Sequence, residues 1–336
     1  KSPALSLMPK QNLHAPCTAS RRRYMILITP RICCMSIPHP STLMSGERLK
    51  IFEQLQLIPY LQQRQILQFT DLPLHGELYL HSDDAPWILF IPGIGTYSEL
   101  YCEMLCKLSR QGFNTLSIDL PGHGYSGGPR GAYQIDTLVT QLREVVDYIE
   151  QRYSGPICLF GCSIGSRIGL AVAEQDSRIK ALVCHTLLLN ELPPDMFHDM
   201  GWQALSMSRW MMPGMEVDFR TFIDIDNILE HNPMGEFARH DSRIVWNYPI
   251  ATLDSLYSAK SSILERPLGI PAAIIVGEHD DVLPPAYIRR LIERSAQPFD
   301  LFEFTNAAHM LPFDQVDLTV STVSRWLTDA LTINND

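Results

Sequence analysis

The sequence predicts an α/β protein with a doubly wound, mostly parallel sheet and a helical cap inserted after the fourth core strand. From about residue 67, short apolar runs alternate with longer amphipathic segments, as strands and crossover helices do. This alternation stops after residue 188 and resumes at residue 271. At 336 residues the chain is long enough for one large domain with such an insertion.

The first half of the core follows from these runs in order. The run Trp87–Ile91 is apolar throughout and ends at Pro92-Gly93, as expected for a strand covered on both faces. Helical segments that end near Gly112 and Gly155 fit the preference for glycine after a helix. The predicted strands are 67–72, 75–81, 87–91, 114–118, 157–160 and 180–188, and the predicted helices are 98–111, 135–153 and 166–175.

The second half of the core resumes the same order and fixes the domain limits. We expect a strand at 272–276, a helix at 285–295, a strand at 300–304 and a helix at 315–331. The core therefore comprises 47–188 and 269–336, and 189–268 forms the cap or lid. Residues 1–46 contain six basic residues and no acid, are rich in Pro and Ser, and are expected to lie outside the fold. They are interpreted as a disordered or non-native extension, with a transit peptide as the alternative.

Composition excludes several classes of function. No apolar run is long enough to span a bilayer, and a net charge of −10 disfavours nucleic acid and anionic lipid as partners. Cysteines such as Cys158, Cys162 and Cys184 fall in or beside apolar runs, which favours buried thiols and a cytoplasmic location. No ligand set has zinc-like spacing and no loop has the phosphate-binding lysine pattern, so neither metal nor organic cofactor is expected. The oligomeric state stays open.

The pentapeptide Gly161-Cys162-Ser163-Ile164-Gly165 lies between a predicted strand and a predicted helix. In this G-x-S-x-G context the sharp turn forces the serine into a strained conformation, and the glycines let the backbone close around it. Ser163 is therefore the candidate nucleophile, projecting above the carboxyl edge of the sheet. A glycine-rich turn with an ordinary serine is the alternative.

A serine nucleophile needs a base, and the base needs an acid that fixes its tautomer. The strand 272–276 leads into Asp280 and Asp281, and the next strand leads into His309. All three loops meet at one edge of the sheet in the order Ser, acid, His. We take His309 as base and Asp280 as acid, with Asp281 as the less favoured choice because neighbouring loop residues point opposite ways. His279 precedes the acid and is interpreted as a solvent-facing loop residue.

Acyl transfer also needs donors aimed at the developing oxyanion. The backbone N–H of Ile164 lies at the start of the helix that follows Ser163. The loop Pro92-Gly93-Ile94-Gly95 follows a core strand, and Ile94 is the candidate for the second donor. A tight turn without a catalytic part is the alternative for this loop.

Together these motifs resemble the monoacylglycerol lipase and lysophospholipase-like α/β-hydrolases, also grouped as serine aminopeptidase-like hydrolases. The resemblance covers about residues 65–330 and includes the run 119–131, DLPGHGYSGGPRG, which looks like that family's D-x-x-G-H-G-x-S-x-G-x-R-G loop. It implies an α/β-hydrolase fold and a structural role for His123. The chain differs from the family at Pro92-Gly93, where His-Gly is usual, and at Ser166, where a second glycine is usual.

The cap carries methionines at helical spacing, Met196, Met200, Met207 and Met211, together with Trp210. Flexible, polarizable side chains suit variable acyl chains, so Met207, Trp210 and Met211 are the expected substrate-binding residues. The equally weighted alternative is a stripe that only packs the cap against the sheet. A transient contact of the cap with a lipid surface also stays open.

We therefore expect a serine hydrolase that cleaves carboxylic esters such as monoacylglycerols or lysophospholipids, with a small-molecule acyl ester as substrate. One triad serves all acyl transfers, so an aminopeptidase or a thioesterase is the first alternative. An amine-binding acid in the cap would favour the peptidase, and Asp218, Asp224 and Asp226 are candidates. The second alternative is a non-catalytic binding protein that keeps the fold.

Overall fold

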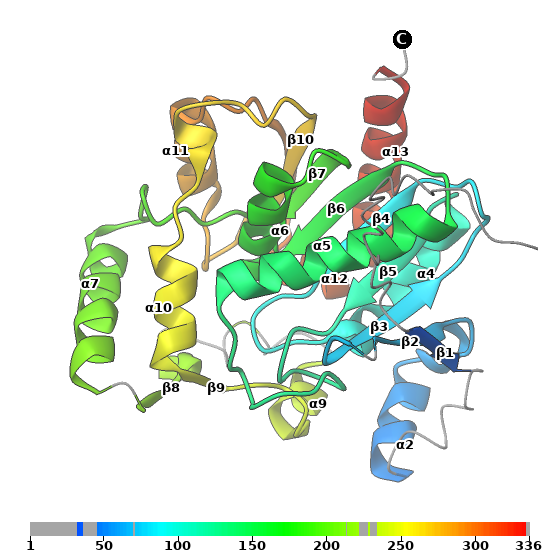
Figure 1. Cartoon of the computed structure of the whole chain (residues 1–336), viewed down its shortest axis with the longest axis horizontal. Coiled ribbons are helices and arrows are strands. Elements are labelled where there is room, and N and C mark those ends of the chain that lie inside the picture. The colour runs from blue at the N-terminus through cyan, green and yellow to red at the C-terminus, as the bar shows by residue number, and fades with distance from the viewer. Residues whose placement is uncertain are drawn as a thin grey trace, which may run out of the picture.

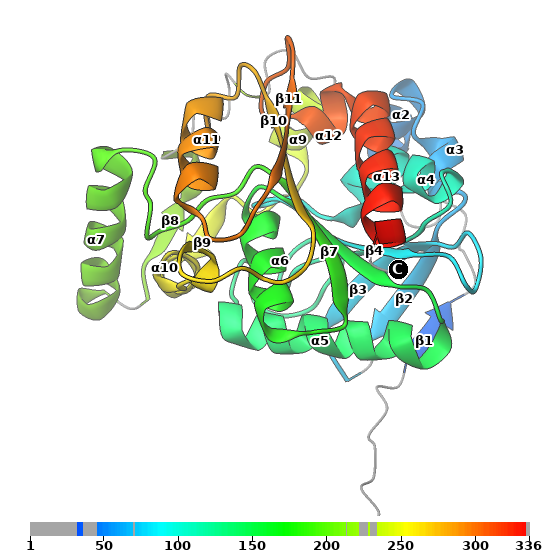
Figure 2. The same cartoon turned by 90° about the horizontal axis from the view of Figure 1, so that it is seen from above.

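A nine-stranded sheet organises the protein (Figures 1 and 2). The computed structural model describes residues 32–35, 46–69, 71–212, 214–221, 228 and 234–333. The pairings from β5 to β11 are parallel, and those that join β1, β2, β3 and β5 are antiparallel. In spatial order the strands are β1 (Ile32–Met35), β2 (Gln65–Phe69), β3 (Leu74–Tyr79), β5 (Asn114–Ile118), β4 (Trp87–Ile91), β6 (Ile157–Cys162), β7 (Ile179–His185), β10 (Ala272–Gly277) and β11 (Asp300–Phe304).

Helices cover both faces of this sheet, which explains why its core strands are continuously apolar. In β4, Leu89 and Ile91 pack into one hydrophobic cluster, while Ile88 and Phe90 pack into the other. Figure 2 shows α5 (Ile135–Arg152) and α6 (Ile164–Gln175) on one side, and α4 (Cys102–Arg110) and α13 (Val316–Ile333) on the other. The helix α11 (Pro285–Arg294) joins the first cluster. The predicted doubly wound, mostly parallel architecture is confirmed.

Short helices complete the framework around the sheet. The 3-10 turn η1 (Ser98–Tyr101) leads into α4, and α12 (Leu311–Asp314) leads into α13. Between β1 and β2, α2 (Gly46–Gln54) and α3 (Ile58–Leu61) bury Phe52 and Leu61 against the cluster that contains α4 and α13. No element was predicted for these residues from the sequence.

The segment between β7 and β10 is mainly helical, as expected, but it also holds a small antiparallel sheet. Strands of three residues are too short for a readable alternation. In Figure 1 the helices α7 and α10 stand at the left, beyond the carboxyl ends of the parallel strands. The elements are α7 (Met196–Met211), β8 (Glu216–Asp218), η2 (Phe219–Thr221), α9 (Gly235–His240), β9 (Asn247–Pro249), α10 (Ile250–Ser258) and η3 (Ser262–Leu264).

One expectation about the N-terminal stretch needs correction. Residues 32–35 form β1, which pairs with β2 in the register Ile32↔Phe69 to Met35↔Ile66, so these four residues belong to the sheet. A four-residue run is too short to show a periodicity. The pairing of β1 with the edge of β2 therefore becomes evident only in the folded structure. The other residues before 46 lie outside the described residues. The two opening strands, β2 and β3, also lie one to three residues earlier than expected.

Candidate active site

The turn between β6 and α6 places Ser163 in a strained conformation. Its φ of 51° and ψ of −116° are unfavourable for a residue with a side chain. The flanking glycines are required by space, since a Cβ on Gly161 would lie 2.4 Å from the backbone of Gly165, and one on Gly165 would lie 2.2 Å from the carbonyl of Ile91. The G-x-S-x-G run therefore folds as the strand–turn–helix element that the sequence predicted.

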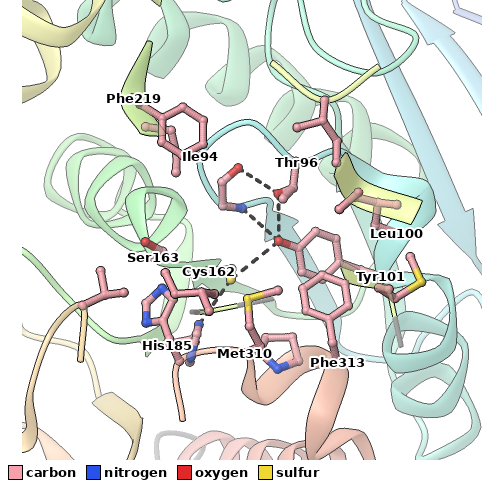
Figure 3. Close-up of a pocket in the computed structure, with 18 of the residues that line it drawn as sticks. Ile94, Thr96, Leu100, Tyr101, Cys162, Ser163, His185, Phe219, Met310 and Phe313 are labelled. Atoms are coloured by element: carbon pink, nitrogen blue, oxygen red, sulfur yellow. Dashed lines mark hydrogen bonds between the residues drawn. The ribbon is translucent and has the colours of Figure 1, made fainter. Parts of the chain in front are cut away.

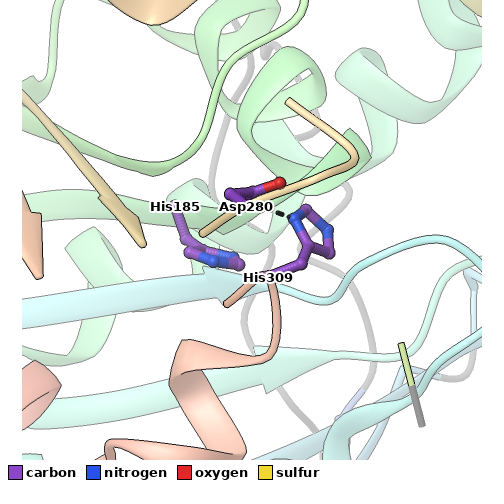
Figure 4. A group of neighbouring side chains, drawn as sticks. All are labelled: His185, Asp280 and His309. Atoms are coloured by element: carbon purple, nitrogen blue, oxygen red, sulfur yellow. Dashed lines mark hydrogen bonds and ion pairs between the residues drawn. The ribbon is translucent and has the colours of Figure 1, made fainter. Parts of the chain in front are cut away.

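Two neighbouring loops bring Asp280 and His309 together. The Nδ1 of His309 donates to Oδ2 of Asp280 at 2.7 Å (Figure 4), and the other carboxylate oxygen accepts from the backbone N–H groups of Val282 and Leu283 at 2.9 and 2.8 Å. The loops are joined by the N–H of His279, which donates to the carbonyl of Ala307. This arrangement fixes the orientation of the imidazole.

Asp280 has the environment of an orienting carboxylate. Burial by itself raises the pKa of this carboxyl, but the nearby His309 and the hydrogen bonds it receives outweigh burial, and its pKa lies below the usual value. The carboxylate is therefore ionised at neutral pH. Asp280 is 2% exposed, whereas Asp281 and His279 are exposed. Of the two neighbouring aspartates, Asp280 is therefore the one that the structure places against His309.

A second histidine, His185 at the end of β7, lies beside this pair. Its ring centroid is 5.2 Å from that of His309, and its Nδ1 is 3.2 Å from Sγ of Cys162 (Figure 3). Burial and the His309 ring lower the pKa of His185 to about 3. Burial also raises the pKa of the Cys162 thiol to about 12, so this cysteine stays protonated and does not compete with Ser163 as nucleophile.

Sequence reasoning missed His185. The available signal was a polar residue at the carboxyl end of an apolar strand, which is where site residues of α/β sheets gather. Among the described residues, His185, Asp280 and His309 form the one group of buried side chains whose ligand atoms lie within 4.8 Å of one another. These are the residues that could hold a metal ion.

The loop after β4 contains Ile94, whose backbone N–H was the expected second oxyanion donor. The N–H of Gly93 donates to Tyr101 Oη at 3.2 Å and the N–H of Gly95 donates to Tyr248 Oη at 2.7 Å. The N–H of Ile94, between them, has no acceptor among the described residues. The N–H of Ile164 is also without an acceptor in the described part of the chain, as the first turn of a helix allows. Both Ile94 and Ile164 line a pocket with Ser163.

His123 is linked to the loop after β4 through the hydroxyl of Tyr248. It is fully buried, and its Nδ1 donates to the carbonyl of Pro121 at 3.0 Å. Burial lowers the pKa of His123 to about 4, so its neutral Nε2 accepts from the hydroxyl of Tyr248 at 2.6 Å. That hydroxyl in turn accepts from Gly95. His123 therefore links the 119–131 loop to the oxyanion loop, in keeping with the expected structural role.

Ser166 stands where a second glycine is usual after the serine, and its side chain finds hydrogen-bond acceptors there. Its side chain is fully buried, and its hydroxyl lies 2.8 Å from the carbonyl of Gly161 and 3.3 Å from that of His185. Because both oxygens are acceptors near the turn, the hydroxyl adds a hydrogen bond that glycine would not supply.

Two pockets meet at Ser163. The first is lined almost entirely by aliphatic and aromatic side chains, and it also contains His185 and His309 (Figure 3). The second extends toward α7 and α10 and has polar groups on its wall from His198, Thr221 and Tyr257. Both share Ile94, Phe219 and Val282 with Ser163. The candidate nucleophile therefore lies where an apolar and a more polar cavity join.

The three cap residues expected to bind substrate do not line either pocket. Met207, Trp210 and Met211 are 65%, 87% and 67% exposed, so they lie on the outer face of α7. The inner face supplies Trp202 and Leu205 to the second pocket. The spacing of the methionines predicted the helix but assigned its stripe to the wrong side, because periodicity does not indicate which face meets the protein.

Comparison with known proteins identifies the family of this chain. Residues 84–316 match the family model described as serine aminopeptidase, S33, a hydrolase family. The chain belongs to this hydrolase family. The match spans the serine turn, both loops of the Asp280–His309 pair and the segment between β7 and β10.

The similar proteins and solved structures are distant in sequence. An uncharacterized protein of Mycobacterium tuberculosis is 23% identical over 74% of this chain and 76% of its own length. The monoacylglycerol lipase of Paleococcus ferrophilus is 20% identical with a TM-score of 0.61, covering 76% of this chain and 99% of that one. A monoglyceride lipase of Saccharomyces cerevisiae is 16% identical with a TM-score of 0.64, covering 80% and 92%. These structures are similar in fold, and the α/β-hydrolase fold is thereby shown.

Among the helices that the structure describes, none combines the length and apolar character of a bilayer-spanning helix.

Proposed function

We propose that this hydrolase cleaves carboxylic esters, with Ser163 as nucleophile, His309 as base and Asp280 as the acid that orients it. One observation carries the proposal: Ser163, strained on its turn, lies at the junction of two pockets, and the imidazole of the His309–Asp280 pair lines one of them. A nucleophile, an oriented base and room for both halves of an ester are the requirements of acyl transfer.

In the proposed reaction, the hydroxyl of Ser163 passes its proton to Nε2 of His309 and attacks the ester carbonyl. The N–H groups of Ile94 and Ile164 stabilise the oxyanion. The imidazolium then protonates the departing alcohol and leaves an acyl-enzyme. Water, activated by the same imidazole, releases the acid and restores Ser163. Ionised Asp280 stabilises the positive imidazolium throughout.

The two pockets suggest how a substrate is divided. The apolar pocket suits an acyl chain, because each buried methylene contributes about 0.8 kcal/mol. The second pocket, with His198, Thr221 and Tyr257, suits an alcohol that forms hydrogen bonds. Monoacylglycerols, lysophospholipids and related acyl esters have this division into an apolar chain and a polar head.

The segment 189–268 acts in this proposal as a cap over the site. Its helix α7 exposes Met196, Met200, Met207, Trp210 and Met211. A row of exposed apolar side chains on one helix is suited to transient contact with a lipid surface, from which ester substrates would be taken. We also propose a cytoplasmic location, since Cys102, Cys106, Cys158, Cys162 and Cys184 are all buried and form no disulfide.

A hydrolysis panel tests the ester activity. We expect kcat/KM to rise by one to two orders of magnitude from p-nitrophenyl acetate to the octanoate, and monoacylglycerols to be cleaved. A fluorophosphonate should label the wild-type protein and fail to label Ser163→Ala. Absence of both labelling and turnover would favour the non-catalytic binding protein.

The family description makes an aminopeptidase the second candidate. It requires an acid that holds the amine of the substrate, and Asp218 instead forms an ion pair with Arg220. Asp224 and Asp226 lie outside the described residues. Faster cleavage of aminoacyl amides than of any ester in the panel would replace the esterase by a peptidase, and faster cleavage of acyl thioesters would replace it by a thioesterase.

A further inference from the structure

The imidazole of His185 has no part in the proposed hydrolysis, although it lies beside the residues that carry it (Figure 4). Its side chain is 1% exposed. The Nδ1 faces Cys162, and Nε2 has no hydrogen-bond partner in the described part of the chain. An imidazole nitrogen that the other side chains leave without an acceptor or donor is available as a ligand atom.

The neighbours of His185 supply the rest of a coordination site. One ligand atom each from His185, Asp280 and His309 lie within 4.8 Å of one another, and all three residues are buried. In a tetrahedral zinc site with bonds of about 2.1 Å, ligand atoms are about 3.4 Å apart. The Asp280–His309 pair, now at 2.7 Å, would open slightly and His185 would approach.

The donor set favours one class of cation. Two imidazole nitrogens and one carboxylate oxygen suit Zn²⁺, whereas Mg²⁺ and Ca²⁺ prefer oxygen ligands alone. Three protein ligands leave a fourth position for water. His185 and His309 both line the apolar pocket that contains Ser163, so this pocket provides both an entry path and the space for that water.

We propose that His185, Asp280 and His309 bind Zn²⁺ and that the bound ion inhibits the enzyme reversibly. The ion takes the place of the proton on Nδ1 of His309, and this proton passes to solvent. Oδ2 of Asp280 then binds the cation instead of the imidazole, while its Oδ1 keeps the N–H groups of Val282 and Leu283. The inhibitory effect rests on the proposed function, because it assumes that His309 is the base. The binding itself does not.

Binding is measured without turnover by titrating the wild-type protein with Co²⁺ and following the intense visible absorption of tetrahedral Co²⁺. Addition of ZnCl₂ should abolish this absorption. ZnCl₂ should also inhibit hydrolysis of a p-nitrophenyl ester, and EDTA should restore it. His185→Gln should weaken both zinc competition and zinc inhibition at least tenfold, each compared with the zinc-free state of the same variant.

His279→Gln is the matched control, since His279 is exposed and directly precedes Asp280. It should bind Co²⁺ like the wild type. If His185→Gln does not fold, Asp280→Asn serves as the second variant and should also lose the absorption. An absent tetrahedral signal in the wild-type protein, or unchanged zinc affinity in the folded variants, would overturn the site. If Co²⁺ binding depends on His185 but the protein has no esterase activity, the proposed function is wrong and the proposed metal site still holds.

Discussion

Arg48 and Asp241, which are 193 residues apart in sequence, form a buried ion pair with Nη1 and Oδ2 separated by 2.8 Å. Arg48 lies on α2 and also pairs with Glu99, and its guanidinium stacks near the rings of Phe52 and Phe237. Asp241 follows α9, and the neighbouring residues Met234 and Ala238 line the apolar pocket. The helix α2 therefore stabilises one wall of that pocket.

Arg48→Met should reduce the free energy of unfolding by about 3 kcal/mol or more, because it leaves the carboxylates of Glu99 and Asp241 buried without this partner. Urea unfolding measures the change. The double variant Arg48→Met/Asp241→Asn should lose less free energy of unfolding than the sum of the two single variants. Asp241→Asn removes one of the two buried negative charges that Arg48→Met leaves without this partner. Arg289→Met, which breaks the exposed pair with Glu303, is the control and should cost less than about 1 kcal/mol. Equal costs for Arg48 and Arg289 would contradict this assignment.

Ser163→Ala should keep the fold and reduce ester turnover by at least about 10³-fold. Ser163→Gly should be equally inactive but more stable than Ser163→Ala by about 1 kcal/mol, because glycine tolerates a φ of 51° without strain. Thermal unfolding of the two variants gives the comparison. Turnover near the wild-type rate in either variant would rule out Ser163 as nucleophile.

Asp280→Asn should reduce kcat by about 10⁴-fold, since an amide neither holds the correct imidazole tautomer nor stabilises its cation. Asp281→Asn should change kcat less than about twofold, because Asp281 is exposed and the carboxylate bonded to His309 is that of Asp280. Steady-state kinetics of both variants on one ester provide the test. A larger loss in Asp281→Asn would reassign the acid.

Tyr248→Phe should lower kcat about tenfold and leave KM nearly unchanged. The hydroxyl holds the N–H of Gly95 next to Ile94, and a displaced oxyanion donor weakens transition-state binding more than substrate binding. Tyr60→Phe, which removes a long hydrogen bond to Glu103 far from the site, is the control. A rise in KM alone would show that Tyr248 only shapes the pocket.

Trp202→Ala and Trp210→Ala separate the two faces of α7. Trp202 lines the second pocket, so its truncation should raise KM for a monoacylglycerol several-fold in solution. Trp210 is 87% exposed, and its truncation should leave kinetics on dissolved esters unchanged while weakening sedimentation with neutral lipid vesicles. A larger kinetic effect of Trp210→Ala than of Trp202→Ala on dissolved esters would show that the outer face of α7 binds substrate.

The sequence alone determined the framework and predicted the candidate reacting groups, because both depend on local requirements. A strand covered on both faces needs a continuous apolar run, and Trp87–Ile91 and Asn114–Ile118 were predicted with the bounds that the structure has. The Ser163 turn needs glycine at 161 and 165 to avoid backbone contacts. The order of three loops at one edge then placed His309 beside Asp280.

Only the tertiary structure decided features that depend on which distant surfaces meet. The periodicity of α7 fits either face, and the contact with α10 determined that Trp202, rather than Trp210, lines a pocket. The partner of Arg48 lies 193 residues away, and no local pattern encodes such a separation. Likewise, His185 lies beside the Asp280–His309 pair because β10 pairs with β7 on one side and with β11 on the other. This strand order is established only when the chain is folded.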